Sequence, residues 1–224
     1  MTGTLYGVGL GPGDPELMTV KAWRLVSTAK VIAYLAANDS ESTARAIAAP
    51  FMPEDATEIA IPMPMRVERE PAQAAYDAGA KQIAAHLSRG EDVVMLCEGD
   101  PFFYGSFMYL FARLAESYPC TIVPGVTSMT ASAAALRRPL SARNEVVKVL
   151  PATLPEDRLR EELMTTESAV LIKVGRHLAK VRNILGLLDL SSRAHVIVKA
   201  THEDQVVTPL LDITEDHLPY FSSI

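Results

Sequence analysis

The chain has 224 residues, with 21 Lys and Arg against 27 Asp and Glu, so its formal net charge is −6. This excess of acidic residues argues against a nucleic-acid partner, because such binding depends on neutralising phosphates. The chain opens without a basic leader and holds no apolar run of the roughly 18 residues that span a bilayer, which predicts a soluble, cytoplasmic protein without membrane contact.

The first half of the chain alternates between strand-like apolar runs and segments of helical periodicity. Expected strands lie at 4–9, 31–35 and 92–98, and expected helices at 17–30, 72–88 and 107–118. The stretch 49–71 is rich in proline and is expected to be an irregular surface connection. Parallel strands with helical crossovers are the economical arrangement for this pattern.

The second half of the chain has a different pattern of apolar and charged residues. Strand-like runs at 146–150, 169–174 and 195–199 are separated by charged helical segments, and a small-residue helix precedes them. We expect a domain boundary near Pro124, giving an N-terminal α/β domain over 1–124 and a C-terminal α/β domain over 125–224. A last apolar run at 217–224 starts another strand, which we expect to be cut short.

Two loops repeat the same three residues, glycine, aspartate and proline. Asp14-Pro15 and Asp100-Pro101 each place an N-cap residue before a proline at the first helical position, so both loops are expected to end in a helix start. In an open parallel sheet such loops meet at the carboxyl ends of the strands, where ligands bind. The alternative is a pair of well-capped helices that hold no ligand.

The first loop, "GVGLGPGDPELM", resembles a dinucleotide-binding loop, but it contains Pro12 and Asp14, which are not typical of a loop that binds a pyrophosphate. A carboxylate at a helix start occupies the free amides and repels phosphate. S-adenosylmethionine has a sulfonium, an ammonium and ribose hydroxyls but no phosphate, and it suits glycines that allow close backbone approach and nearby carboxylates. The alternative interpretation of this loop is that the protein is a nicotinamide oxidoreductase.

Five motifs, in this order and spacing, resemble the tetrapyrrole methylase family and, within it, the precorrin-2 C20-methyltransferases of cobalamin biosynthesis. They are "GVGLGPGDPELMTVKA", "CEGDPFFYGSFMYL", "VPGVTSMTASAAA", "LPATLPEDRLREEL" and "IKVGRHLAKVR". The resemblance implies an α/β, two-domain tetrapyrrole methylase fold. It has a mostly parallel N-terminal sheet with helical crossovers, a mixed C-terminal sheet and a cofactor cleft between the domains. It also implies a homodimer.

Carried over position by position, the resemblance implies contacts to S-adenosylmethionine, or to its product S-adenosylhomocysteine. The implied residues are Pro12, Glu98, Gly99, Asp100, Phe103, Thr127, Ser128, Val174 and Ala200. Two departures from the family pattern stand out. Lys199 occupies a place where an acidic or neutral residue is expected before "AT", and the expected closing strand and basic tail do not follow Ile224.

The implied reaction is methylation of precorrin-2 at C20 to give precorrin-3A. The substrate carbon is the nucleophile, so alignment carries the catalysis. Tyr104 and Glu98 are the candidates for a base that accepts the meso proton. Precorrin-2 has eight carboxylates, and the candidate partners are Arg66, Arg69, Arg137, Arg138 and Arg143, with solvated surface charge as the alternative for each.

Three questions stay open at this level. The acceptor is either metal-free precorrin-2 or its cobalt form, cobalt-factor II, or the enzyme methylates another position of a tetrapyrrole. A catalytically silent binding protein would keep the same loops. The histidines and the cysteines Cys97 and Cys120 show no ligand spacing, so we expect reduced thiols and no protein-bound metal.

Overall fold

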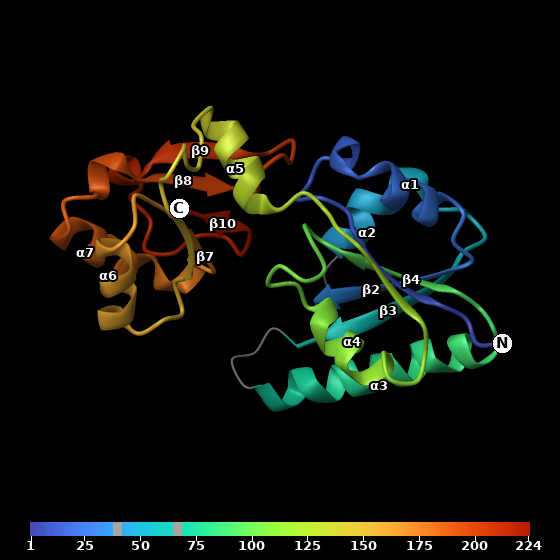
Figure 1. The fold of residues 1–224 in the computed structure, drawn as a ribbon. Helices are drawn as coiled ribbons and strands as arrows, with labels where there is room; N and C mark the ends of the chain where they lie inside the picture. The colour runs from blue at the N-terminus through green and yellow to red at the C-terminus, as the bar shows by residue number, and fades with distance from the viewer. Residues whose placement is uncertain (38–41, 65–68) are drawn as a thin grey trace. The chain divides into compact units, whose positions relative to one another are not determined.

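The computed structural model describes residues 1–37, 42–64 and 69–224. The chain divides into two compact units, Met1–Thr127 and Ser128–Ile224, whereas the sequence predicts the division at 124. Six of the seven expected strands are confirmed within two residues at each end, and the run at 217–224 forms a strand of two residues, Ser222–Ser223. The three helices expected in the first half are found with different bounds. Each unit is an α/β structure (Figure 1), as the sequence predicts.

The first unit is built on a parallel sheet. Its strands are β1 (Leu5–Gly9), β2 (Val31–Ala37), β3 (Thr57–Met63), β4 (Val93–Cys97) and β5 (Cys120–Val123), in the order β3-β2-β4-β1-β5. All the pairings are parallel. Parallel neighbours need crossover connections, which here contain α1 (Val20–Ser27), α2 (Thr43–Ala48), α3 (Arg69–Ser88), α4 (Phe107–Leu114) and the 3-10 turns η1 (Pro15–Leu17) and η2 (Ala49–Phe51).

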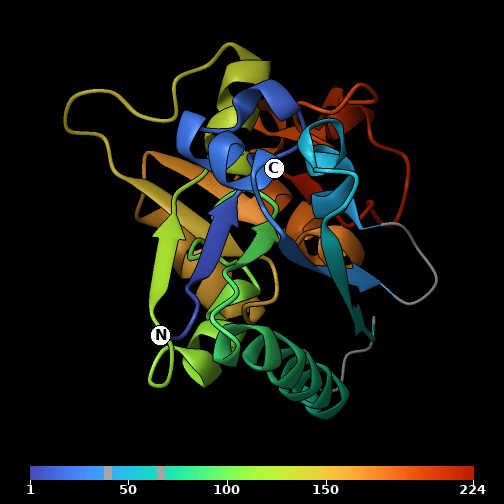
Figure 2. The same ribbon diagram turned by 90° about the vertical axis from the view of Figure 1, so that its right-hand side faces the viewer.

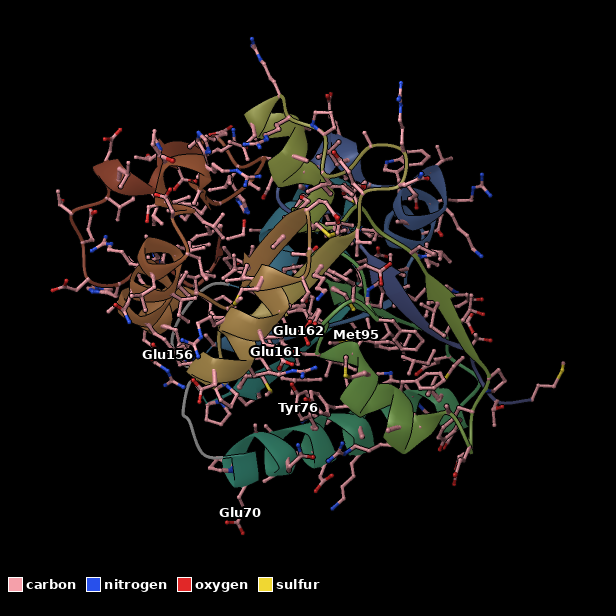
Figure 3. All side chains as sticks on the ribbon, turned by 60° about the vertical axis from the view of Figure 1, so that its left-hand side comes forward. Glu70, Tyr76, Met95, Glu156, Glu161 and Glu162 are labelled. Atoms are coloured by element: carbon pink, nitrogen blue, oxygen red, sulfur yellow. The ribbon has the colours of Figure 1, made fainter. Side chains whose placement is uncertain are left out.

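Helices cover both faces of this sheet. Successive strand residues point to opposite faces, so Val31 belongs to the core under α3 and α4, and Ile32 to the core under α1 and α2. Figures 1 and 2 show these helix pairs on opposite sides of the strands. Figure 3 labels Tyr76 on α3 and Met95 on β4, which share the first of these cores. Burial on both faces explains the nearly continuous apolar runs of the central strands.

The irregular connection expected over 49–71 is wrong, because it contains β3. Ile59 and Ile61 alternate with exposed residues and are buried, which is the pattern of a strand with one face in the core. Pro62 lies in the same strand, and β3 tolerates it because it is the edge strand of the sheet. The prolines on either side concealed this short alternation.

The second unit has two small sheets. β6 (Val147–Pro151) and β7 (Ser168–Ile172) are parallel, whereas β8 (His195–Val198) pairs antiparallel with β9 (Val206–Pro209) and with β10 (Ser222–Ser223). Ile224, directly after β10, exchanges backbone hydrogen bonds with Leu171 of β7, at 2.7 and 3.0 Å. β10 is therefore antiparallel to β7 as well as to β8, so β7 and β8 run in the same direction.

The helices of the second unit are α5 (Ser128–Leu136), α6 (Glu156–Met164) and α7 (Leu178–Leu187), with 3-10 turns at Gly175–His177 (η3), Ser191–Arg193 (η4) and Leu210–Asp212 (η5). α7 buries Leu178, Val181, Ile184 and Leu185, which share one helical face, against Leu159 of α6 and Val196 of β8. The opposite face of α6 is charged, and Figure 3 labels Glu156, Glu161 and Glu162 on that helix. The sequence did not predict β9.

Candidate functional site

Three loops of the first unit meet at one edge of its sheet. They follow β1, β4 and β5, which are adjacent and parallel, so their carboxyl ends lie side by side. The first two loops also bridge directly, because Gly11 N–H donates to Gly99 O at 3.3 Å and Gly99 N–H donates to Gly11 O at 2.8 Å. This is the edge at which open parallel sheets bind ligands.

The glycines of these loops let the loops approach one another. A β-carbon on Gly9 would lie 2.7 Å from Gly99 O and from Gly125 N, and one on Gly125 would lie 2.0 Å from Gly99 O. Any side chain at these two positions would therefore separate the loops. Gly99 differs, because a β-carbon there would have just Val126 O near it, at 3.8 Å, and its φ is +63°. The open side of Gly99 is where a ligand could approach the backbone.

Asp100 joins the second loop to the third. Its Oδ1 accepts hydrogen bonds from the amides of Phe102 (2.9 Å) and Phe103 (3.1 Å), and its Oδ2 accepts from the amide of Gly125 (3.0 Å). The carboxylate thus occupies the amides of its own turn, as the sequence predicts. The helix start expected here is wrong, because α4 begins only at Phe107, after a turn with Tyr104 at positive φ.

The first loop does end in a helical turn. Asp14 caps η1, with its Oδ1 accepting from the amide of Glu16 at 2.8 Å and Pro15 at the first position. This turn is three residues of 3-10 helix, and α1 begins separately, at Val20, behind its own cap Thr19. Pro12 lies buried between the Gly11 bridge and this cap.

Glu98 carries the carboxylate at the end of β4. Its Oε1 accepts a hydrogen bond of 3.1 Å from the amide of Ala44, at the start of α2. Burial raises the pKa of the Glu98 carboxyl, and hydrogen bonds from its own amide and that of Ala44 oppose the rise. The sequence did not predict α2, so it also missed this partner.

In the second unit, the candidates Val174 and Ala200 lie just beyond β7 and β8. Both are buried, and each follows a lysine with positive φ, Lys173 at 56° and Lys199 at 50°. Thr201 also has positive φ, 69°. Non-glycine residues in this region are strained and concentrate at functional sites. Because β7 and β8 run in the same direction, both strained segments lie at one edge of the second unit.

Lys199, which departs from the family pattern, forms an ion pair with Asp204. The same segment closes on itself, because Gln205 Oε1 accepts from the amide of Thr201 at 2.7 Å. The positive charge of Lys199 is therefore paired with a carboxylate of its own loop. The nearby His202 buries its Nε2 without a hydrogen-bond partner among the described residues, a feature that no sequence motif signalled.

The remaining candidates differ in how far the structure describes them. Thr127 ends the first unit and Ser128 begins α5 in the second. Arg66 and the side chain of Arg69 lie outside the described residues. Three exposed arginines remain, and in the described part of the chain no carboxylate lies within 4.0 Å of their guanidinium groups; they are Arg137, Arg138 and Arg143.

Two further observations apply to the described residues alone. Within residues 1–37, 42–64 and 69–224, no group of three or more His, Cys, Asp or Glu side chains is placed to hold a metal ion. Across the same ranges, none of the helices combines the length and the apolar character needed to cross a membrane.

Comparisons with known proteins agree with this architecture. Cobalamin biosynthesis protein CobIJ of Mycobacterium tuberculosis is 42% identical over 229 residues, which are 98% of this chain and 45% of that protein, so the chain spans less than half the length of this relative. Precorrin-2 C(20)-methyltransferase of a Sinorhizobium species is 38% identical over 99% of this chain and 94% of that protein. Cobalt-precorrin-2 C(20)-methyltransferase of Salmonella typhimurium is 29% identical over 100% and 96%.

Solved structures share the fold. The cobalt precorrin-4 methyltransferase CbiF has a TM-score of 0.71 and 26% identity, covering 93% of this chain and 86% of that one. Uroporphyrin-III C-methyltransferase from Thermus thermophilus, solved with S-adenosyl homocysteine, has a TM-score of 0.67 and 23% identity, covering 99% and 95%. The family model for tetrapyrrole (corrin/porphyrin) methylases matches residues 4–213, and the chain therefore belongs to that family.

Proposed function

We propose that this protein transfers a methyl group from S-adenosylmethionine to C20 of precorrin-2, giving precorrin-3A, in cobalamin biosynthesis. The observation that carries the proposal is the 38% identity to the Sinorhizobium enzyme of that name, which extends over nearly the full length of both chains. The glycine loops at the carboxyl edge of the parallel sheet support it, because the Asp100 carboxylate already occupies loop amides, which disfavours a phosphate-bearing cofactor and suits one that carries positive charge.

The resemblance to the family implies which residues contact this cofactor. S-adenosylmethionine provides an electrophilic methyl group on its sulfonium. The residues that would hold it are Pro12, Glu98, Gly99, Asp100, Phe103 and Thr127 in the first unit and Ser128, Val174 and Ala200 in the second. The open side of Gly99 offers room for a ligand atom. Asp100 would act mainly by fixing the loop, because both of its oxygens already accept backbone hydrogen bonds.

The protein's contribution to the chemistry would be alignment. The substrate carbon carries its own electrons, so the chain needs no activated nucleophile, and positioning two reactants can lower a barrier by about 7–11 kcal/mol. Glu98 and Tyr104 are the candidates for accepting the proton that leaves the meso carbon. Burial raises the pKa of Glu98, which makes its carboxylate a stronger base.

The eight carboxylates of the substrate would be met by arginines. In the described part of the chain, no carboxylate pairs with Arg137, Arg138 or Arg143, which follow α5 within seven residues of one another. Guanidinium groups bind carboxylates in a bidentate way. Arg66 and Arg69 are the two further candidates from the sequence analysis.

The metal-free acceptor is favoured over its cobalt form. Identity to the Sinorhizobium enzyme is 38%, against 29% to the Salmonella enzyme named for the cobalt compound. Methylation of cobalt-factor II is therefore the second candidate. We further propose that the protein is a homodimer, as its resemblance to the family implies, and that it is cytoplasmic, as its two unpaired cysteines suggest. Sedimentation of the purified chain tests the oligomeric state.

The decisive experiment is turnover with methyl-labelled S-adenosylmethionine and enzymatically made precorrin-2, with and without cobalt. Label at C20 supports the proposal, and the better acceptor assigns the metal state. Label at another carbon, or none on either acceptor, overturns it. Thermal shift with S-adenosylhomocysteine against NAD(P) separates a methyltransferase from an oxidoreductase, because a ligand of the folded state raises Tm.

A further inference from the structure

The short helix α2 supplies a hydrogen bond to the buried carboxylate at the end of β4. The amide of Ala44, the second residue of this helix, donates to Glu98 Oε1 at 3.1 Å. A helix of six residues is not stable by itself in water, so tertiary contacts must fix its place. The contacts that orient α2 therefore also orient the amide from which Glu98 accepts.

The apolar face of α2 holds the helix against the sheet without fixing its exact position. Ala44, Ile47 and Ala48 are buried in the core that α1 and α2 cover. Burial of apolar surface is non-directional, so it resists separation of the helix from the sheet more strongly than a small slide or rotation. The cap of Ser42 on the amide of Arg45 belongs to the helix itself and does not link it to the sheet. A directional contact is needed to hold the Ala44 amide in place.

A carboxylate on β3 provides that contact. Glu58 accepts two hydrogen bonds from the guanidinium of Arg45, from Nε to Oε2 at 2.6 Å and from Nη2 to Oε1 at 2.8 Å. Its Oε2 also accepts from the hydroxyl of Tyr34 on β2, at 2.7 Å. We call Tyr34, Arg45 and Glu58 the Glu58 clamp. Paired bonds of this kind fix direction as well as distance, so the clamp ties α2 to two adjacent strands at the residue that follows Ala44.

The clamp is charged, yet it contributes little to stability by itself. Hydrogen bonding with Glu58 raises the pKa of Arg45, and hydrogen bonding from Arg45 lowers the pKa of Glu58. The side chains of Arg45 and Glu58 are 44% and 31% exposed, so water screens their attraction. An ion pair that adds little stability but fixes the geometry of a helix is suited to positioning.

We propose that Glu58, acting through Arg45, is a positioning residue that holds the amide of Ala44 against the carboxylate of Glu98. This rests on the proposed function, in which Glu98 is a candidate for accepting the proton of the meso carbon. The pKa of Glu98 reports the contact, because the hydrogen bond from Ala44 favours the charged carboxylate and opposes the rise that burial causes. Loss of the clamp should therefore be felt at Glu98, on a different strand from Glu58.

The test uses Glu58→Gln, which lacks the second carboxylate oxygen, and Arg45→Met, which keeps an unbranched side chain without the charge. In both variants we expect the Ala44 amide to exchange about fivefold faster by NMR. The Glu98 carboxyl, followed by its ¹³C shift, should titrate at higher pH than in the wild type. The acid limb of the kcat profile should move in the same direction, because a base must lose its proton before it can act. These substitutions leave in place the other ionisable side chains on neighbouring elements, which are Asp14, Tyr34, Cys97 and Asp100.

Asp77→Asn is the matched control. Asp77 pairs with Arg113 at 2.6 Å and ties α3 to α4 on the other face of the same sheet. Its loss should leave both the Ala44 exchange and the Glu98 titration unchanged. Unchanged exchange and titration in either clamp variant, or an equal change in Asp77→Asn, overturns the proposal.

The kinetic readout separates this proposal from the proposed function. An acid limb that stays in place while the pKa of Glu98 rises overturns the link between the clamp and the reaction. Failure of wild-type turnover with precorrin-2 would refute the proposed function alone, because the exchange and the titration are both measured without substrate.

Discussion

Replacing Asp100 with asparagine tests the junction between the second and third loops. The side chain keeps its size, but one carboxylate oxygen becomes an NH₂ group. If the remaining oxygen continues to accept from Phe102 and Phe103, the new NH₂ faces the amide of Gly125, and two donors oppose each other. The substitution therefore breaks one of three hydrogen bonds and removes the charge from the other two.

The size of the effect follows from these three bonds. A hydrogen bond to a charged acceptor contributes about 1.5–3 kcal/mol and a neutral one about 0.5–1.5 kcal/mol. Losing one bond and weakening two gives an upper limit of about 3.5–6 kcal/mol, and because the Phe102 amide is exposed and all three bonds share one carboxylate, we expect a smaller net cost, about 2 kcal/mol. That cost corresponds to about 30-fold faster opening-limited exchange of the Gly125 amide.

Amide hydrogen exchange measured by NMR reads this effect at the residue itself. Asp92→Asn is the matched control, because Asp92 lies at the opposite end of β4 and accepts a single bond, of 2.7 Å, from the amide of Thr4. The asparagine carbonyl can keep that bond. If the amides of Gly125 and Phe103 exchange as slowly in Asp100→Asn as in Asp92→Asn, the junction does not depend on the carboxylate, and the reasoning is refuted.

Three more predictions concern charge. Burial raises the pKa of Glu98 in the folded state, so the stability of the wild type falls as the pH rises from the unfolded-state pKa through the folded-state pKa of this group. In urea unfolding from pH 4 to pH 7, the stability of Glu98→Gln relative to the wild type should therefore increase. A stability difference between the two proteins that does not change with pH would contradict this. The pKa of Glu58 shifts in the opposite direction, because hydrogen bonds from Arg45 lower it. Glu58→Gln should cost less than about 1 kcal/mol at pH 7 and nothing below the folded pKa of Glu58, whereas a cost that persists in acid would exclude the ion pair as its cause. Alanine at the three arginines of 137–143 should raise KM for precorrin-2 about tenfold at constant cofactor Kd, while Arg158→Ala on α6 should not; equal effects would show that the arginines act by general charge.

Much of the first unit could be predicted from the sequence because its signals are local. Alternation of apolar runs and helical periodicity is a property of neighbouring residues, and it located the central strands correctly. β3 was missed because flanking prolines masked two alternating isoleucines, Ile59 and Ile61, and the edge position that makes Pro62 acceptable is known only from the sheet order. β9 and α2 were missed because each is too short to show a period.

The candidate site divides in the same way. By itself the sequence determined that two loops share one distinctive pattern, since Gly-Asp-Pro after an apolar run is a local signal for a helix cap or a sharp turn. Only the tertiary structure decided what those residues do. The roles of Gly9, Gly125 and Asp100 arise from contacts between loops that lie far apart in the chain, and the amide of Ala44 reaches Glu98 across 54 residues. Such contacts depend on which strands become neighbours, and strand order is a property of the folded sheet that no window of sequence contains.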